Sequence, residues 1–263
     1  MTNNCNESLT VKDGDPIPST MMFSSGVVGN IVALVLLEVR RGKASPSLYL
    51  ILVTALLLTD LLGSISVSPV VLTAYAREKT LLGMSAKKEL CSYFGFTMTF
   101  LSLSTLAILC ALALERYFSI GHPYFYERHM SKRFGYITLP LIFLGSITFC
   151  VAPLFGFGEY VQYCPGTWCF LDMNRKKRKD QIYSGFYVSI ILIMIFITLL
   201  CNISVITHLV RMYRRRKVRR RGVSAHSRYR RSLSMTEEVE HLLPLAVITV
   251  VYICCTFPIV VRA

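Results

Sequence analysis

The sequence predicts an all-α protein, a polytopic bundle of membrane-spanning helices, and three observations support this fold class. Hydrophobic residues make up 53% of the 263 residues and charged residues only 17%, whereas roughly a quarter of a soluble domain is charged. The apolar residues are grouped in blocks of roughly 20 or more, the length that a helix needs to span a bilayer core. These blocks are too long, and alternate too little, for the strands of a membrane β-barrel.

The net charge of +14 would suit a nucleic-acid partner, but its distribution argues against one. Basic residues lie in short loops between the apolar blocks, where they determine topology and contact anionic lipid or an intracellular partner. We therefore expect membrane lipid as a partner and no nucleic acid. The cysteines and histidines show no zinc-type spacing and form no catalytic set with the acids, so the sequence predicts neither an enzyme nor a cofactor.

We interpret residues 1–263 as a single transmembrane domain with six spans. Residues 1–16 are polar and carry a glycosylation sequon at Asn6, which suits an extracellular N-terminus, and no cleavable signal peptide is visible. The spans are expected at approximately 18–37, 48–75, 91–117, 134–157, 183–210 and 237–261. Basic residues are more numerous in the loops that this topology places inside, as the positive-inside rule requires.

The first two spans carry polar residues that are costly in lipid. Asn30 in the first span can hydrogen-bond to another helix. Asp60 lies near the middle of the second span, where an acid costs roughly 2.5 to 3.5 kcal/mol unless it faces the bundle, a partner or an ion. Asp60 is therefore a candidate functional residue, and a hydrogen bond inside the bundle is the alternative interpretation.

The third span begins at Cys91 and closes with Glu115, Arg116 and Tyr117. An acid beside an arginine can be an interfacial pair that only ends a helix, or a functional group. Arg116 lies 25 residues after Cys91, which is about 38 Å along a helix. The two residues therefore lie on opposite sides of the membrane. If Cys91 is in a disulfide, Arg116 is cytoplasmic.

The later spans are interrupted by prolines or followed by basic loops. The fourth contains Pro140 and Pro153, and the fifth runs into a strongly basic segment, residues 211–231. Directly after this segment, Ser232 and Ser234 match the preference of basophilic kinases. A phosphate there would reduce the local positive charge.

The nine cysteines divide by position. Five fall inside apolar blocks and are interpreted as small buried residues: Cys110, Cys150, Cys201, Cys254 and Cys255. The other four lie in loops or at span edges, where an oxidising compartment allows two disulfides: Cys5, Cys91, Cys164 and Cys169. Three pairings are possible, and the spacing does not choose among them.

Six of these features, in order, resemble the rhodopsin-like G-protein-coupled receptors. They are Asn30, Asp60, Cys91, the Glu115-Arg116-Tyr117 triplet, Cys169 and Pro258. The segment 162–170, QYCPGTWCF, is similar to the second-loop signature of the prostanoid receptors, which is highly specific. The similarity extends over essentially the whole chain. It implies a bundle of the seven-transmembrane receptor type, with only six of its spans expected in this chain.

The resemblance implies a G-protein-coupled receptor in the plasma membrane, whose ligand is a prostaglandin and whose partner is a heterotrimeric G protein. Because it is strongest to the Gs-coupled branch, it implies prostaglandin E2 and a rise in cyclic AMP. Prostacyclin and prostaglandin D2 are the alternatives from that branch.

Two alternatives belong to other classes of protein. The family's seventh span carries an arginine for the prostanoid carboxylate, and no residue up to Ala263 can be given that role. The chain would then be a truncated, non-signalling or dominant-negative receptor fragment that binds prostaglandin poorly. The other alternative is a transporter, which should show internal repeats, and none is visible.

The resemblance also implies a ligand site. Tyr75 and Thr167 offer hydroxyls to a carboxylate, Met98 and Thr99 line an apolar slot, and Trp168 forms a wall. For Tyr75 the alternative is a place in the interfacial aromatic belt, and for Met98 a place in the ordinary core.

Two more sites are implied in the same way. Asp60 belongs to an allosteric sodium site, to which Ser104 adds a hydroxyl. In the Glu115-Arg116-Tyr117 switch, Glu115 holds Arg116 at rest and activation frees it to meet the G-protein α-subunit, because such pairs are weak enough to break.

The resemblance further implies two disulfides. The family pairing joins Cys91 to Cys169 and would pin the second outer loop over the start of the third span. The receptors of the prostacyclin type imply a second pair between Cys5 and Cys164.

Overall fold

The computed structural model describes residues 8–11, 14–41, 47–85, 88–130, 132–173 and 178–219. Several sequence predictions lie outside these described residues. They are the sixth span at 237–261, the sequon at Asn6, the expected disulfide partner Cys5, the kinase-type sites Ser232 and Ser234, and the two cysteines Cys254 and Cys255.

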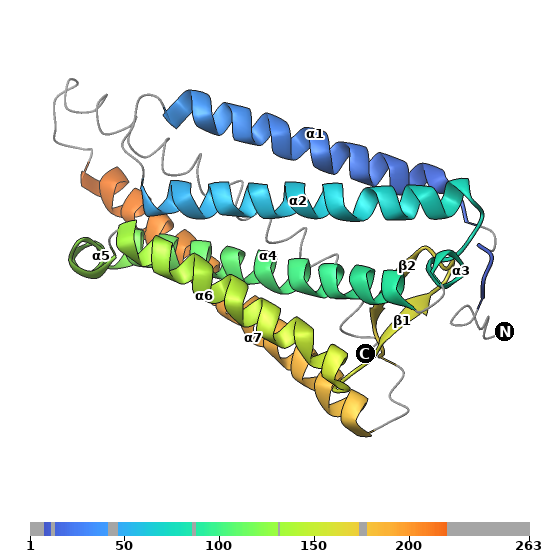
Figure 1. Ribbon diagram of the computed structural model, residues 1–263. Helices are drawn as coiled ribbons and strands as arrows, with labels where there is room; N and C mark the ends of the chain where they lie inside the picture. Colours follow the sequence, from blue (N-terminus) through green and yellow to red (C-terminus); the bar gives the residue numbers. More distant parts are fainter. Residues whose placement is uncertain are drawn as a thin grey trace. The chain divides into compact units, whose positions relative to one another are not determined.

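The described chain is helical except for one short hairpin (Figure 1). The long helices are α1 (Pro16–Arg41), α2 (Leu48–Ala76), α4 (Glu89–Gly121), α6 (Lys132–Val151) and α7 (Arg178–Arg219). The short ones are α3 (Leu81–Met84), α5 (Pro123–His129) and the 3-10 helix η2 (Ala152–Phe155). The hairpin pairs β1 (Tyr160–Tyr163) with β2 (Trp168–Leu171) in antiparallel register.

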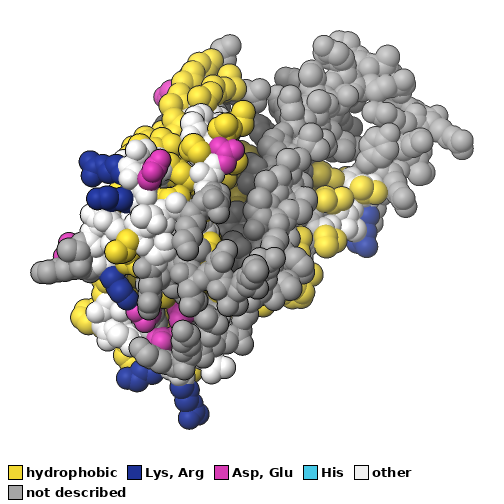
Figure 2. Space-filling view, turned by 90° about the vertical axis from the view of Figure 1, so that its right-hand side faces the viewer, with side chains coloured by type: hydrophobic (Ala, Val, Ile, Leu, Met, Phe, Trp, Pro, Cys, Tyr) yellow, Lys and Arg dark blue, Asp and Glu magenta, His cyan; other side chains and the backbone are white. Residues whose placement is uncertain are grey.

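Within the described ranges, five helices are long and apolar enough to cross a membrane. They overlap the first five spans expected from the sequence. The first, third and fifth extend a few residues beyond the expected bounds at both ends, whereas the fourth ends at Phe155, before the expected end at residue 157. The α7 helix has 42 residues, about 63 Å, which is roughly twice the thickness of a bilayer core. Large apolar side chains are exposed on these helices, as lipid-facing surfaces require. Figure 2 looks onto the end of the helices where α3 and the hairpin lie, and there apolar side chains are interspersed with Lys, Arg, Asp and Glu side chains.

The structure divides into two compact units. The first contains residues Met1–Ile108 and Lys132–Ile191, and the second contains Leu109–Ser131 and Leu192–Ala263. Because α4 and α7 each continue from one unit into the other, the division falls inside these helices. The hairpin and the Cys91 end of α4 belong to the first unit, and the Glu115-Arg116 pair belongs to the second.

The α2 helix turns one face to the core of the first unit. Its buried residues recur every three or four positions, the period of one helix face: Leu48, Leu52, Leu56, Thr59, Gly63, Val67, Val71 and Ala74. At its start, the amide of Leu50 donates to the hydroxyl of Ser47, a regular N-cap. A Cβ built on Gly63 would lie 2.6 Å from Cδ1 of Leu101, so a glycine here lets α2 and α4 pack closely.

A disulfide between Cys91 and Cys169 ties the hairpin to the start of α4. It is the pair that the resemblance implied. Both cysteines are fully buried in a cluster with five apolar residues, namely Val67, Val71, Ala74, Leu81 and Phe94. Cys164 is also disulfide-bonded. The predicted interior cysteines that the structure describes, Cys110, Cys150 and Cys201, are free and buried.

Removing the cross-link should destabilise the protein more than removing other buried cysteines. The Cys91→Ala/Cys169→Ala variant opens a loop of 78 residues, which costs about 2 to 4 kcal/mol. We expect the melting temperature of the detergent-solubilised protein to fall by roughly 5 to 10 °C, measured by loss of the monomer peak in size-exclusion chromatography after heating. The control, Cys110→Ala/Cys150→Ala, deletes two buried thiols without opening a loop. Equal losses for the two variants would contradict the prediction.

Candidate functional site

Three of the five expected ligand contacts pack against the cluster around the Cys91–Cys169 disulfide. Tyr75 near the end of α2, Met98 in α4 and Trp168 at the start of β2 are all partly buried against it. The disulfide brings them together because it holds β2 beside the start of α4, next to α3 in Figure 1. The cluster therefore joins residues from three separate stretches of sequence.

The indole of Trp168 is fixed by its neighbours. Its ring stacks on that of Tyr163 with centroids 4.8 Å apart, and its Nε1 donates to the carbonyl of Cys164 at 3.0 Å. The Tyr163 hydroxyl donates to the carbonyl of Leu171 and accepts from the amide of Met173. Burial raises the pKa of Tyr163, which keeps its phenol protonated as a donor. This wall of the candidate site is therefore preformed.

The two residues whose hydroxyls are expected to meet a carboxylate are Tyr75 and Thr167, and the Tyr75 ring lies against Gly14, as does Pro165. A Cβ built on Gly14 would lie 2.7 Å from the ring of Tyr75 and 3.4 Å from Pro165, which is two residues before Thr167. Thr167 is buried and Tyr75 half-buried. Neither hydroxyl makes a hydrogen bond to any part of the chain that the structure describes, so both are available to a ligand.

Thr99, expected beside the apolar slot, makes contacts inside the protein. It is fully buried, and its hydroxyl donates to the carbonyl of Gly95 at 2.8 Å and also meets the hydroxyl of Tyr160. Tyr160 in turn donates to the carbonyl of Cys150 at 3.0 Å. A Cβ on Gly95 would lie 2.4 Å from the Tyr160 ring. Thr99 therefore belongs to a polar joint between α4 and β1, which the sequence patterns did not indicate.

The carboxylate of Asp60 is held by a hydroxyl of α4. The hydroxyl of Thr105 donates to Oδ1 of Asp60 at 2.8 Å. The expected residue, Ser104, is fully buried, and its hydroxyl has no hydrogen-bond partner among the described residues. Cys91, Met98 and Thr105 recur every seven residues and so share one face of α4. That spacing is the signal that would have selected Thr105.

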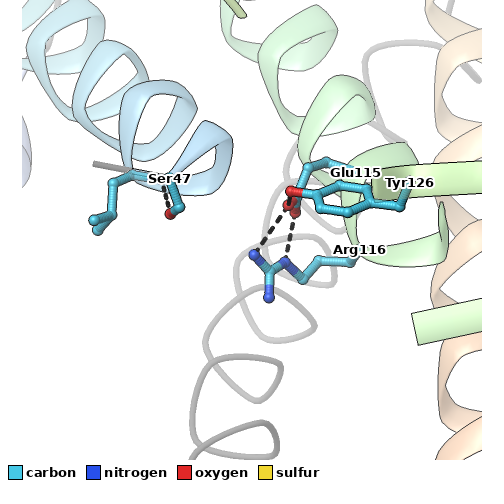
Figure 3. Close-up of polar contacts among 5 residues, drawn as sticks. Ser47, Glu115, Arg116 and Tyr126 are labelled. Carbon is cyan, nitrogen blue, oxygen red and sulfur yellow. Dashed lines mark hydrogen bonds and ion pairs between the residues drawn. The ribbon is translucent and has the colours of Figure 1, made fainter. Parts of the chain in front are cut away.

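At the other end of α4, Glu115 and Arg116 form a two-point ion pair (Figure 3). Nε of Arg116 donates to Oε2 of Glu115 at 2.6 Å, and Nη2 of Arg116 donates to Oε1 of Glu115 at 3.2 Å. Oε1 also accepts a hydrogen bond from the hydroxyl of Tyr126 in α5 at 2.7 Å. Burial and the adjacent Glu115 carboxylate raise the pKa of Tyr126, so its phenol stays protonated and can donate.

Exposure differs within this pair. The side chain of Glu115 is 2% exposed and that of Arg116 is 16% exposed. The carboxylate is thus the more deeply buried partner and depends on its donors, because an unpaired buried charge is costly. The sequence patterns did not indicate the bond from Tyr126 to Glu115.

The third member of the triplet, Tyr117, helps to seat α5 on the end of α4. Its hydroxyl lies 3.2 Å from Nε2 of His122, and its ring makes an edge contact with Phe118 at 5.2 Å. Phe118 packs against Phe125 of α5 with centroids 5.3 Å apart. These ring contacts fix α5 in the place from which Tyr126 reaches Glu115.

Comparison with known proteins identifies the family and the fold. The sequence profile of the 7 transmembrane receptor (rhodopsin family) matches residues 29–263, so the chain belongs to the rhodopsin family of G-protein-coupled receptors and is not an enzyme. The structure of squid rhodopsin has the same fold, with a TM-score of 0.72 over 97% of this chain and 76% of that chain, at 16% sequence identity. The predicted fold class is confirmed.

Within that family, the chain is a prostanoid receptor. It is 47% identical over 264 residues to the prostaglandin E2 receptor EP2 subtype of Mus musculus, covering 94% of this chain and 72% of that protein. It is 40% identical over 265 residues to the prostacyclin receptor of Homo sapiens, covering 100% of this chain and 67% of that protein. These relatives confirm the family that the second-loop signature indicated.

The bond between Thr105 and Asp60 should contribute measurably to stability. Thr105→Val keeps the shape of the side chain but leaves the Asp60 carboxylate without this donor, which costs about 1 to 3 kcal/mol. Thr105→Ser should retain most of the stability, measured as the temperature of half-maximal loss of monomer in detergent. Thr97→Val is the control, because the Thr97 hydroxyl bonds only within its own helix, to the Tyr93 carbonyl. A Thr105→Val variant as stable as the control would refute the prediction.

Proposed function

We propose that this chain is a plasma-membrane receptor for prostaglandin E2 that couples through Gs and raises cyclic AMP. The observation that carries the proposal is its identity of 47% across 94% of its length to the mouse prostaglandin E2 receptor EP2 subtype, compared with 40% to the human prostacyclin receptor. An extracellular N-terminus accompanies the proposal. It puts the Cys91–Cys169 disulfide in an oxidising compartment and the Glu115-Arg116 pair at the cytoplasm.

The ligand chemistry suits the cluster around this disulfide. A prostaglandin has one carboxylate and long apolar chains, so its site needs a few donors above an apolar surface. Tyr75 and Thr167 have hydroxyls free to donate to the carboxylate, and Met98 and the fixed indole of Trp168 provide apolar surface. Trp168 is held in place before binding, which lowers the entropy lost when a ligand is ordered against it.

The signal would pass through the Glu115-Arg116 pair. At rest, Glu115 retains Arg116. Agonist favours a state in which Arg116 is released to the G-protein α-subunit. Releasing Arg116 leaves a carboxylate that is 2% exposed, and the hydroxyl of Tyr126 is the donor that remains on it. Tyr126 therefore lowers the cost of the active state.

Two further elements belong to the proposal. Asp60 and Thr105 offer a carboxylate and a hydroxyl oxygen, the ligand types that hard cations prefer, which supports an allosteric sodium site formed with Thr105. The exposed apolar helices and basic loops support membrane lipid as a second kind of partner.

Cyclic AMP accumulation in cells that express the receptor tests the ligand and the pathway together. We expect prostaglandin E2 to act at lower concentration than prostaglandin D2 or a stable prostacyclin analogue. A response to either of those at concentrations where prostaglandin E2 is inactive would sink the assignment of the ligand. A chain that reaches the cell surface and responds to none of the three would instead favour the non-signalling alternative.

The role of Tyr126 can be tested by removing only its hydroxyl group. Tyr126→Phe should raise the half-maximal concentration of prostaglandin E2 for cyclic AMP about fivefold to tenfold, because the buried carboxylate loses its remaining donor in the active state. Tyr124→Phe is the matched control on the same helix, since the Tyr124 side chain is 79% exposed. Equal potency for the two variants, at equal surface expression, would rule out this role.

A further inference from the structure

The segment that precedes α1 is built into the layer formed by the hairpin and the α2–α4 connection. We name residues 8–11 together with Gly14 the N-terminal strap. Thr10 forms an antiparallel bridge with Lys79. Two backbone bonds flank it, from the Val11 amide to the Glu78 carbonyl at 3.1 Å and from the Thr80 amide to the Leu9 carbonyl at 3.2 Å. The strap thus adds to the connection as an extra strand would.

Two buried side chains converge on one carbonyl of the strap. The Thr80 hydroxyl donates to the carbonyl of Ser8 at 2.6 Å, and Nε2 of Gln162 donates to the same oxygen at 3.1 Å. Thr80 is 0% and Gln162 1% exposed. Each also accepts a backbone amide at 3.1 Å, Thr80 that of Gly83 and Gln162 that of Leu82. The carbonyl oxygen of Ser8 therefore links Thr80, the N-cap of α3, to Gln162 of β1.

The fit around this point is too close for larger residues. A Cβ on Gly83 would lie 2.3 Å from the carbonyl oxygen of Leu9, and a Cβ on Gly166 would lie 2.4 Å from the methyl group of Thr80. Gly166 has a φ of +103°, which disfavours any other residue, and its carbonyl accepts the Leu81 amide at 3.0 Å. The contact between the strap and its neighbours is thus specific.

The other end of the strap touches the candidate ligand site. Gly14 lies against the ring of Tyr75 and against Pro165. Pro165 belongs to the turn between β1 and β2, which carries Thr167 and leads into Trp168. A displacement of the strap would therefore free the Tyr75 ring on one side and this turn on the other.

We propose that Thr80 and Gln162 are positioning residues for ligand recognition. They seat the N-terminal strap on the carbonyl of Ser8, and the seated strap holds Tyr75 and the Thr167 turn in the geometry that retains the ligand. This inference rests on the proposed prostaglandin-binding function. Loss of a preorganised contact after binding speeds dissociation more than it slows association. The dissociation rate is therefore the quantity to measure.

The experiment compares Thr80→Val with Thr80→Ser in membranes that contain the full receptor. The valine keeps the shape and removes both hydrogen bonds, whereas the serine keeps the hydroxyl. Tritiated prostaglandin E2 should dissociate about fivefold to tenfold faster from Thr80→Val, as expected for one or two buried hydrogen bonds, and within about twofold of the unaltered rate from Thr80→Ser. Equal dissociation rates for the two variants would overturn the inference.

A second variant and a second measurement guard against simple misfolding. Gln162→Glu keeps an acceptor for the Leu82 amide but puts a carboxylate beside the Ser8 carbonyl, so it should also speed dissociation. Hydrogen–deuterium exchange of peptides covering residues 8–11 and 78–83 should rise in Thr80→Val and Gln162→Glu while peptides from α6 stay unchanged. Faster exchange in the strap together with an unaltered dissociation rate would overturn the positioning role.

The design separates the two proposals. If the unaltered receptor binds tritiated prostaglandin D2 instead of E2, the same rates are measured with prostaglandin D2, and only the proposed ligand fails. If it binds either ligand normally and the variants dissociate at the unaltered rate, only the role of the strap fails. If the unaltered receptor binds neither, the proposed function and this inference are both overturned.

Discussion

The end of the receptor that carries the hairpin depends on the covalent bond between Cys91 and Cys169. The hairpin has two strands of four residues each, and an isolated hairpin of that size is marginally stable. The disulfide stabilises the hairpin by fixing β2 beside α4. The ring of Tyr163, stacked on Trp168, then fixes the indole. Without this bond, the tryptophan and the threonine of the signature would sit on a mobile loop.

Two buried carboxylates on the apolar helices, those of Asp60 and Glu115, obtain their donors in different ways. No water is available in a bilayer core to satisfy a carboxylate, so each one needs a protein donor or an ion. Asp60 receives a hydrogen bond from the neutral hydroxyl of Thr105. Glu115 already has its cation in Arg116 and adds the hydroxyl of Tyr126. The two acids on neighbouring helices thus have different chemistry because their donors differ in charge.

Sequence patterns predicted the features that depend on short stretches of chain. Span length and hydropathy follow from composition over roughly 20 residues, and five described helices match them. The hydrogen bond from Thr105 to Asp60 was not predicted, because position within a span was used instead of the seven-residue repeat of α4. The bond from Tyr126 to Glu115 was missed because His122, at φ −135° and ψ 63°, breaks the helix between them. The contacts of Ser8 with Thr80 and Gln162 span 72 and 154 residues, and no local periodicity encodes such a distance.

The adjacency of Glu115 and Arg116 on one helix has a consequence for how such a receptor is driven. When the two members of an ion pair lie on different helices, moving the helices apart separates them. Two consecutive residues of α4 travel together, so no rigid-body motion changes their distance. In the proposed mechanism, this pair opens by competition, when another acceptor takes Arg116 or another donor satisfies Glu115. The proposed switch therefore depends on the chemistry of the incoming partner, and helix displacement serves to admit that partner.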